Sequence, residues 1–380
     1  MKLLLLYLDA WPFRYADVLL KEVRNVDPRA VCARLIPVFG YTDCFKVSML
    51  TGMYPDEHGY WVSYMFSSSG KPRPIPKTFS TLLDNSILPI KSIKFILNKF
   101  IGIHMFHTKT WGNILEQEIK TESSFMEIDQ YLRAKGFRVL FNEFESRGIR
   151  YSVLEDRFYG HRLDIFAKAL VKYMAASDVV LAYIDEPDFW GHRYGVEDSN
   201  YIDLLKWLSD IVKYLIRLAV NRGFSYLVFS DHGMVTVKDY IDLYSHVLRD
   251  PEYGKTYVAG IDATFFRIFY LDSYKKDSPI LSQVKKLLRE KASLLREEDL
   301  RRYHLSLDRR YGDEVYALRE GVVLYPNFFN WLKPRGMHAY SPDYTSQHGV
   351  VLASNDIMEN EGVDIDVPKL HSLIKRSLGL

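Results

Sequence analysis

Three apolar segments of this chain end directly in acidic residues, and this feature limits the possible folds more than any other. The segments "KLLLLYLD", "SDVVLAYID" and "FSYLVFSD" are short and almost wholly apolar, and they finish at Asp9, Asp185 and Asp231. Such runs are typical of strands buried on both faces of a parallel sheet. Because ligands of these sheets bind at the carboxyl ends of the strands, we expect the acids to gather along one edge.

Further segments indicate the rest of the fold. We expect strands in "ARLIPVF", "GFRVLFNEF" and "IRYSVLED", and a long helix in "SNYIDLLKWLSDIVKYLIRLAVNRG", whose apolar residues recur at helical spacing. Asp198 and Ser199 are candidate caps of this helix, and Gly223 follows its end. Strands that alternate with helices predict an α/β fold with a mainly parallel central sheet, flanked by helices on both faces.

The chain has 380 residues, and length alone suggests roughly two or three units. We nevertheless expect one domain over residues 1–380, with a cap or lid inserted at 66–140 and a smaller subdomain with its own sheet at 255–340. Within the insert, lysines interrupt the apolar residues of 87–106. That pattern is typical of a basic helix on a membrane surface, or of a helix buried against the sheet with its lysines reaching outward.

Charge and cysteine content limit the partners and the compartment. Fifty basic and 48 acidic residues leave a net charge of +2, so we predict no nucleic-acid partner. Cys32 and Cys44 are too few for a disulfide framework, which favours a reducing, cytoplasmic setting. The N-terminal apolar run stops at Asp9 and no run of ~18 apolar residues follows, so we expect neither a signal peptide nor a transmembrane helix.

The acids at the strand ends predict a metal site. Carboxylates gathered in one place repel each other unless a cation neutralises them. In "DEPDFWGHRYG", Asp188 and His192 are four residues apart, as metal ligands on one helical turn would be. In "SDHGM", Asp231 and His232 are adjacent, which suits a turn that presents both to metal, or a capping motif. His348, in "SQHGVVLAS", is a further candidate, although a lone histidine is more often structural.

The segment "YTDCFKVSMLTGMYP" offers three groups for chemistry. Thr42 carries a hydroxyl, a poor nucleophile unless a divalent cation lowers its pKa. Cys44 would suit zinc, but a buried cysteine usually serves as a small apolar side chain. Lys46 could offset phosphate charge or face solvent.

These motifs together resemble the alkaline phosphatase superfamily, in particular its type I phosphodiesterase/nucleotide pyrophosphatase branch. Members carry an Asp on the first strand, a Thr or Ser nucleophile nine residues before T-G-x-Y-P, then E-x-x-D-x-x-G-H, S-D-H-G-M and a final H-G. This chain has Asp9, Thr42 nine residues before "TGMYP", "DEPDFWGH", "SDHGM" and "QHG", in the same order.

The resemblance implies two divalent metal ions, usually zinc, with manganese or magnesium as alternatives. It places one metal on Asp9, Thr42, Asp231 and His232, and the other on Asp188, His192 and His348. It also implies that Thr42 attacks phosphorus and forms a phospho-threonine intermediate in the hydrolysis of a phosphodiester or pyrophosphate, for example in a nucleotide.

One stretch departs from the branch. Its eukaryotic members carry T-F-P-N, whose Asn binds a phosphoryl oxygen, whereas this chain has Phe45 at that position. Lys46 stands where the related sulfatases have Arg and is a candidate replacement. We do not expect a sulfatase, because its formylglycine is made from Cys or Ser at the position of Thr42. A phosphomonoesterase, a phosphosugar mutase, a phosphoryl-group transferase and a silent binding protein are the alternatives.

Overall fold

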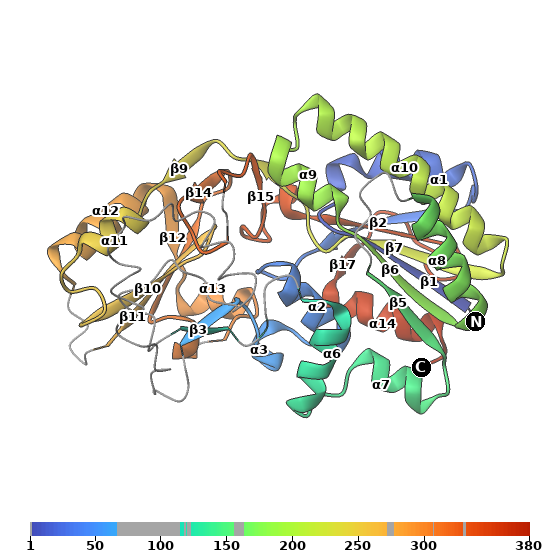
Figure 1. Ribbon diagram of the computed structural model, residues 1–380, viewed down its shortest axis with the longest axis horizontal. Helices are drawn as coiled ribbons and strands as arrows, with labels where there is room; N and C mark the ends of the chain where they lie inside the picture. Colours follow the sequence, from blue (N-terminus) through green and yellow to red (C-terminus); the bar gives the residue numbers. More distant parts are fainter. Residues whose placement is uncertain are drawn as a thin grey trace.

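The computed structural model describes residues 2–66, 115–117, 119, 123–155, 163–271, 277–306, 308–329 and 332–380. Two sheets lie one after the other along the long axis of the molecule, and both chain termini lie at the end that holds the larger sheet (Figure 1).

The larger sheet has seven strands in the order β17-β2-β16-β7-β1-β6-β5. Their bounds are β1 Lys2–Leu8, β2 Val31–Ile36, β5 Tyr151–Leu154, β6 Val179–Ile184, β7 Phe224–Phe229, β16 Gly349–Ala353 and β17 Asp364–Asp366. Strand β16 is antiparallel to β2 and β7, and the other pairs are parallel. The predicted mainly parallel sheet is confirmed.

Helices cover both faces of this sheet, because side chains alternate along each buried strand. On β1, Leu3, Leu5 and Tyr7 face one side, while the even-numbered leucines face the other. The first side packs against α2 (Thr42–Thr51), α6 (Phe125–Ala134), α7 (Leu140–Ser146) and α14 (Val367–Ser377). The second side packs against α1 (Ala16–Arg24), α8 (Leu163–Ala176) and α10 (Ser199–Val220).

The long helix has the ends that the sequence predicts. Helix α10 begins at Ser199, and the Asp198 carboxylate accepts a hydrogen bond from the Asn200 N–H at 2.9 Å. Gly223, just past the helix, has φ +73°. The chain can therefore turn into β7 without the steric cost that a side chain would add there.

The strand expected in "GFRVLFNEF" is wrong, since this segment forms α7. Leu140, Phe141 and Phe144 lie on one helical face and are buried in the core. Asn142 stabilises the helix start, because its side chain accepts a hydrogen bond from the Val139 N–H at 3.1 Å. A short apolar run can form a strand or a buried helix, and helical packing decides this case.

The smaller sheet has four antiparallel strands in the order β10-β11-β13-β12. Its elements are β10 Tyr257–Ile261, β11 Phe265–Tyr270, β12 Ala292–Leu294 and β13 Glu314–Leu318, with α11 Tyr244–Arg249, α12 Pro279–Lys291 and α13 Glu297–Arg302 near it. This sheet falls within the predicted subdomain at 255–340, whose boundaries stay a prediction.

Most of the insert expected at 66–140 lies outside the described residues, and so does all of 87–106. The described part contributes β3 (Tyr64–Phe66), β4 (Leu115–Gln117), α6 and the start of α7. Both of these helices pack on the larger sheet.

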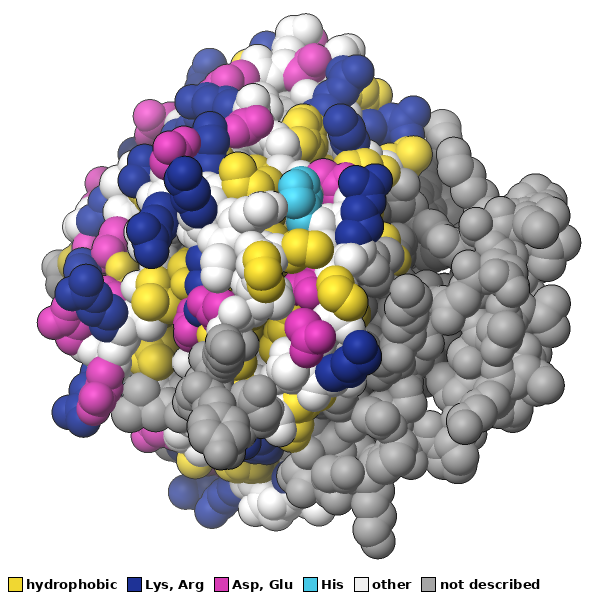
Figure 2. All heavy atoms as spheres, turned by 90° about the vertical axis from the view of Figure 1, so that its left-hand side faces the viewer, with side chains coloured by type: hydrophobic (Ala, Val, Ile, Leu, Met, Phe, Trp, Pro, Cys, Tyr) yellow, Lys and Arg dark blue, Asp and Glu magenta, His cyan; other side chains and the backbone are white. Residues whose placement is uncertain are grey.

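Figure 2 shows the end of the molecule formed by the smaller sheet. Basic and acidic side chains are interspersed over the described part of this face.

Among the described helices, none combines the length and the apolar character that a membrane span requires.

The core packing of β1 gives a first prediction. Leu6 is fully buried, so Leu6→Ala should lower the free energy of unfolding by about 2–5 kcal/mol. Ile165→Ala, on a side chain that is 46% exposed, is the control and should change it by no more than about 0.5 kcal/mol. Chemical denaturation measures both, and equal effects of the two substitutions would contradict the described packing.

Candidate metal centre

The acidic strand ends meet at one edge of the larger sheet, as the sequence predicts. Strand β1 lies between β6 and β7 and is parallel to both, so all three finish at this edge. The Asp9 N–H donates to the Ile184 carbonyl at 2.9 Å, and the Ala10 N–H donates to Asp231 Oδ1 at 3.0 Å. The backbone after β1 is therefore joined to the ends of both neighbouring strands.

Asp9, Asp231 and His232 form the first group of possible metal ligands, with ligand atoms that lie within 4.8 Å of one another. His232 Nε2 is 3.0 Å from Asp231 Oδ2 and 3.8 Å from Asp9 Oδ1. Thr42 Oγ1 is 3.2 Å from the same Nε2. The structure thus brings together all four residues that the sequence assigns to the first metal.

Asp188, His232 and His338 form the second group, again within 4.8 Å. Asp188 and His192 occupy one turn of α9 (Glu186–Tyr194), and His192 Nε2 lies 3.3 Å from Asp188 Oδ1. His338 Nε2 is 3.5 Å from the same oxygen, and its ring stacks on that of His232 with centroids 3.9 Å apart.

The structure places His348 outside both groups of possible ligands, so its assignment to the second metal stays a prediction. His348 precedes β16 at the same edge, but its Nε2 donates to the Pro342 carbonyl at 2.8 Å. It does not belong to either group of possible ligands. His338, which the sequence reasoning missed, lies where His348 was expected.

The residue after His338 explains why the sequence pattern did not single out this histidine. The expected motif was His-Gly, whereas His338 is followed by Ala339. Ala339 has φ +63°, a conformation that glycine adopts at little cost and other residues rarely adopt. Because alanine stands where the expected motif has glycine, the residue letters did not identify this histidine.

The imidazoles are oriented by backbone carbonyls. A carbonyl can only accept a hydrogen bond, so His232 Nδ1 donates to Gly233 O and His192 Nδ1 donates to Gly336 O, each at 2.8 Å. In neutral rings this leaves the Nε2 lone pairs directed at the carboxylates. Histidines that bind metals are commonly held in this way.

Several buried polar atoms of the centre have no hydrogen-bond partner in the described part of the chain: Asp9 Oδ1, Asp188 Oδ1, Asp231 Oδ2 and His338 Nδ1. A buried polar atom without a partner is costly, and four at one site point to a missing cation. The donor set of carboxylates and imidazoles suits zinc and related divalent ions. These residues therefore fit the two metals that the sequence implies.

Burial and the neighbouring charges shift the pKa values of Asp9 and His338 in opposite directions. Burial raises the pKa of Asp9 well above its usual range, and the charges of Asp231 and Asp188 raise it further. Burial, reinforced by His232 and His192, lowers the pKa of His338. A divalent cation favours ionised carboxylates, which Asp9 does not readily provide without one.

Asp231 and His232 stabilise each other. Burial alone would raise the pKa of Asp231 and lower that of His232. Their mutual attraction and hydrogen bond, together with the Ala10 N–H and the Tyr7 hydroxyl at Asp231 and with Asp188 and the Gly233 carbonyl at His232, outweigh burial, so the pKa of Asp231 is lowered and that of His232 is raised.

Thr42 is the first residue of α2, and the residues after it divide between the site and the core. Lys46, one turn later, lies beside the site, and its Nζ donates to the Ser123 carbonyl at 3.0 Å. Phe45 is buried against Tyr7, with ring centroids 5.4 Å apart. The side chain at the position of the family's Asn therefore lies in the core.

Cys44 and His58 are structural. Burial raises the pKa of the Cys44 thiol, which keeps it protonated, and its Sγ contacts the Tyr60 carbonyl at 3.5 Å. His58 Nε2 lies 2.8 Å from Ser48 Oγ, and burial lowers the His58 pKa to about 3. The neutral imidazole thus attaches the short helix α3 (Pro55–His58) to α2.

A cavity of about 900 Å³ opens over the centre. Its walls include the ligand candidates Asp9, Asp188, His192 and His338, together with Thr42 and Lys46. Phe189, Tyr194 and Phe329 give it aromatic surface, and Arg193, Lys333 and Arg335 give it basic groups. Trp190 does not line the cavity but stacks on Tyr194, with ring centroids 5.3 Å apart.

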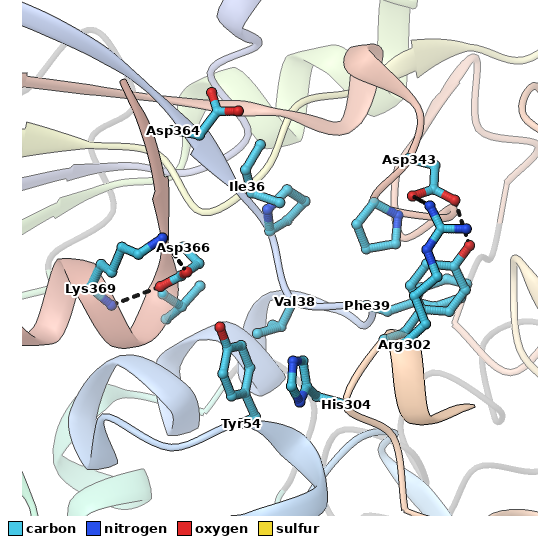
Figure 3. Close-up of a pocket in the computed structure, with 14 residues that line it drawn as sticks. Ile36, Val38, Phe39, Tyr54, Arg302, His304, Asp343, Asp364, Asp366 and Lys369 are labelled. Atoms are coloured by element: carbon cyan, nitrogen blue, oxygen red, sulfur yellow. Dashed lines mark hydrogen bonds and ion pairs between the residues drawn. The ribbon is translucent and has the colours of Figure 1, made fainter. Parts of the chain in front are cut away.

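A second, smaller cavity of about 260 Å³ lies near the end of β2 (Figure 3). Tyr54 and His304 stack on its wall with centroids 3.8 Å apart. Its charged groups pair with one another, as Arg302 does with Asp343 at 2.7 Å. Val38 and Phe39 line this cavity, whereas Tyr41 and Thr42 line the larger one.

Curated proteins are similar to part of this chain in sequence. An ectonucleotide pyrophosphatase/phosphodiesterase family member 7 from Rattus norvegicus is 26% identical over 249 residues, and its Mus musculus counterpart is 25% identical over the same length. Each alignment covers 62% of this chain and 50% of the relative. The chain thus matches about half the length of these curated relatives.

Solved structures extend the likeness of fold to the whole chain. An inactive threonine-to-alanine variant of murine ectonucleotide pyrophosphatase/phosphodiesterase 5, in complex with AMP, has a TM-score of 0.68 at 15% identity. The human protein of the same name has a TM-score of 0.66 at 16% identity. Both comparisons cover 100% of this chain and 95% of the other.

A sequence model of one family matches residues 3–341, which include Thr42 and both groups of possible ligands. This chain therefore belongs to the type I phosphodiesterase/nucleotide pyrophosphatase family, a branch of the alkaline phosphatase superfamily.

Proposed function

We propose that this chain hydrolyses a phosphodiester or pyrophosphate bond with two divalent cations and a covalent phospho-Thr42 intermediate. The observation that carries the proposal is the position of Thr42 Oγ1, 3.2 Å from His232 Nε2, beside buried carboxylate oxygens that have no partner among the described residues. Membership of a phosphodiesterase family supports the reaction class.

Asp9, Thr42, Asp231 and His232 would hold one cation, and Asp188, His192 and His338 the other. Zinc suits these nitrogen and oxygen donors best, with manganese or magnesium as alternatives. When bound, the two cations would lower the pKa of the Thr42 hydroxyl and neutralise negative charge on the phosphoryl group.

Thr42 acts as the nucleophile in this scheme. Its Oγ1 forms a bond to phosphorus while the bond from phosphorus to the leaving oxygen breaks, and water later cleaves the new P–O bond. Because Thr42 begins α2, the phosphoryl group would sit at the N-terminus of a ten-residue helix. The first N–H groups and the dipole of a helix favour an anion at that end.

Lys46 would replace the family's Asn as a partner of the phosphoryl oxygens. Its ammonium has three N–H donors, and the structure assigns one of them to Ser123 O. The ammonium lies 4.8 Å from the centroid of the Tyr183 ring, and the Tyr183 hydroxyl donates to Asp9 Oδ2 at 2.5 Å. Lys46 is therefore fixed beside the first ligand group.

The substrate would be a small phosphoester, and nucleotides are the class that we favour. The AMP bound by the similar murine protein supports this choice. Phe189 and Phe329 could contact a flat apolar group, and Arg193 or Arg335 a second anionic group. Both cysteines are free, and this supports our proposal of a reducing compartment.

Thr42→Ala tests the nucleophile. The variant should lose diester hydrolysis by at least about 1,000-fold, because no other group takes over the attack, while Thr42→Ser should keep measurable activity. Steady-state rates on bis-(p-nitrophenyl) phosphate and p-nitrophenyl phosphate measure this and separate a diesterase from a monoesterase. Undiminished hydrolysis by Thr42→Ala would refute the covalent route.

His338→Ala and His348→Ala distinguish the two assignments of the last histidine. Zinc titration of the metal-free protein should find one tight site fewer in His338→Ala, because a ligand of the second cation is removed. His348→Ala should bind as the wild type does. The opposite pattern would restore His348 as a ligand and exclude His338.

Lys46→Met removes the ammonium and keeps most of the apolar stem. We expect kcat for diester hydrolysis to fall about 100- to 1,000-fold, as for the loss of one donor to a developing oxyanion. Lys369→Met, in the smaller cavity, is the control and should leave kcat unchanged. A Lys46→Met enzyme with the kcat of the wild type would exclude this role.

A further inference from the structure

The turn between β10 and β11 in the smaller sheet contacts two segments of the metal centre at once. Thr264, in this turn, is buried, and its Oγ1 donates to the Ala339 carbonyl at 2.9 Å. The Tyr41 hydroxyl lies 3.2 Å from the same Oγ1. Tyr41 immediately precedes Thr42, and Ala339 immediately follows His338.

The direction of these hydrogen bonds follows from the groups themselves. Thr264 has one hydroxyl proton, and it goes to the Ala339 carbonyl because a carbonyl cannot donate. Tyr41 must therefore donate to Thr264 Oγ1, and the Thr264 N–H donates back to Tyr41 Oη at 3.3 Å.

Each of the two segments lies between the two cavities. Along the first, Val38 and Phe39 line the smaller cavity and Thr42 lines the larger one. Along the second, His338 lines the larger cavity and Pro342 the smaller one. Figure 3 shows Val38, Phe39 and Asp343 around the smaller cavity.

The turn itself is rigid. The Asp262 N–H donates to the Phe265 carbonyl at 3.0 Å, and the Leu318 N–H donates to the Thr264 carbonyl at 2.9 Å. Asp262 also forms a fully buried ion pair with Arg267, with Arg267 Nε 2.7 Å from Asp262 Oδ2. Thr264 is thus fixed to the smaller sheet, while Ala339, at φ +63°, has a conformation that needs support from its surroundings.

We propose that Thr264 is a positioning residue that sets the distance between the nucleophile Thr42 and the ligand His338, through Tyr41 and Ala339. It touches neither substrate nor metal. The inference rests on the proposed two-metal function, and it gives the smaller sheet a part in assembling the centre.

Thr264→Val tests the inference, because valine keeps the shape and removes the hydroxyl. We expect zinc affinity at the site containing His338 and kcat for diester hydrolysis each to fall about 10- to 100-fold, as for other groups that orient metal ligands, with KM nearly unchanged. Thr264→Ser, which keeps the hydroxyl, should restore both to within about threefold. Thr264→Val with wild-type zinc affinity and kcat would overturn the inference.

A metal-free readout separates this inference from the proposed function. In the apo protein, the NMR resonances of the Thr42 methyl group and the His338 imidazole should both shift in Thr264→Val and in Tyr41→Phe, and return toward wild-type values in Thr264→Ser. Shifts at neither residue would overturn the inference even if the enzyme is an active diesterase. Absence of zinc binding by the wild type would overturn the proposed function, while coupled shifts would still support the role of Thr264.

Discussion

Repulsion among three carboxylates, two of them buried and one partly buried, is the constraint on which the rest of this structure depends. Asp9, Asp188 and Asp231 meet at one edge of the larger sheet, and the charges of the other two raise the pKa of Asp9 above the level that burial alone sets. The parallel arrangement of β1, β6 and β7 imposes this convergence, since each strand ends at the same edge. Such a site is stable when cations neutralise its carboxylates. The cations proposed for the chemistry would therefore also stabilise this part of the fold.

The sequence predicted those parts of the centre that depend on strand ends and on short-range spacing. The structure brings Asp9, Asp231 and the pair Asp188 and His192 together, because buried strands and one helical turn place them, and their role as metal ligands stays a prediction. The sequence missed His338, because a backbone turn with φ +63° at an alanine leaves no residue pattern. Likewise, the apolar residues of 139–144 did not distinguish a strand from α7, which only packing against the sheet determines.

The smaller sheet contributes to the site indirectly. Its β10–β11 turn reaches the residue before Thr42 and the residue after His338, which are about 300 positions apart in the chain. Neither contact follows from local sequence, since hydrogen bonds between distant segments depend on the folded arrangement of both sheets. In this account the larger sheet supplies the ligands and the nucleophile, and the smaller sheet holds their spacing.

Anomalous X-ray diffraction at the zinc edge, on crystals grown with zinc, tests the central claim most directly. The account predicts two peaks, one among Asp9, Asp231, His232 and Thr42, and one among Asp188, His192 and His338. A single peak, a peak at His348, or no peak among the three carboxylates would contradict it.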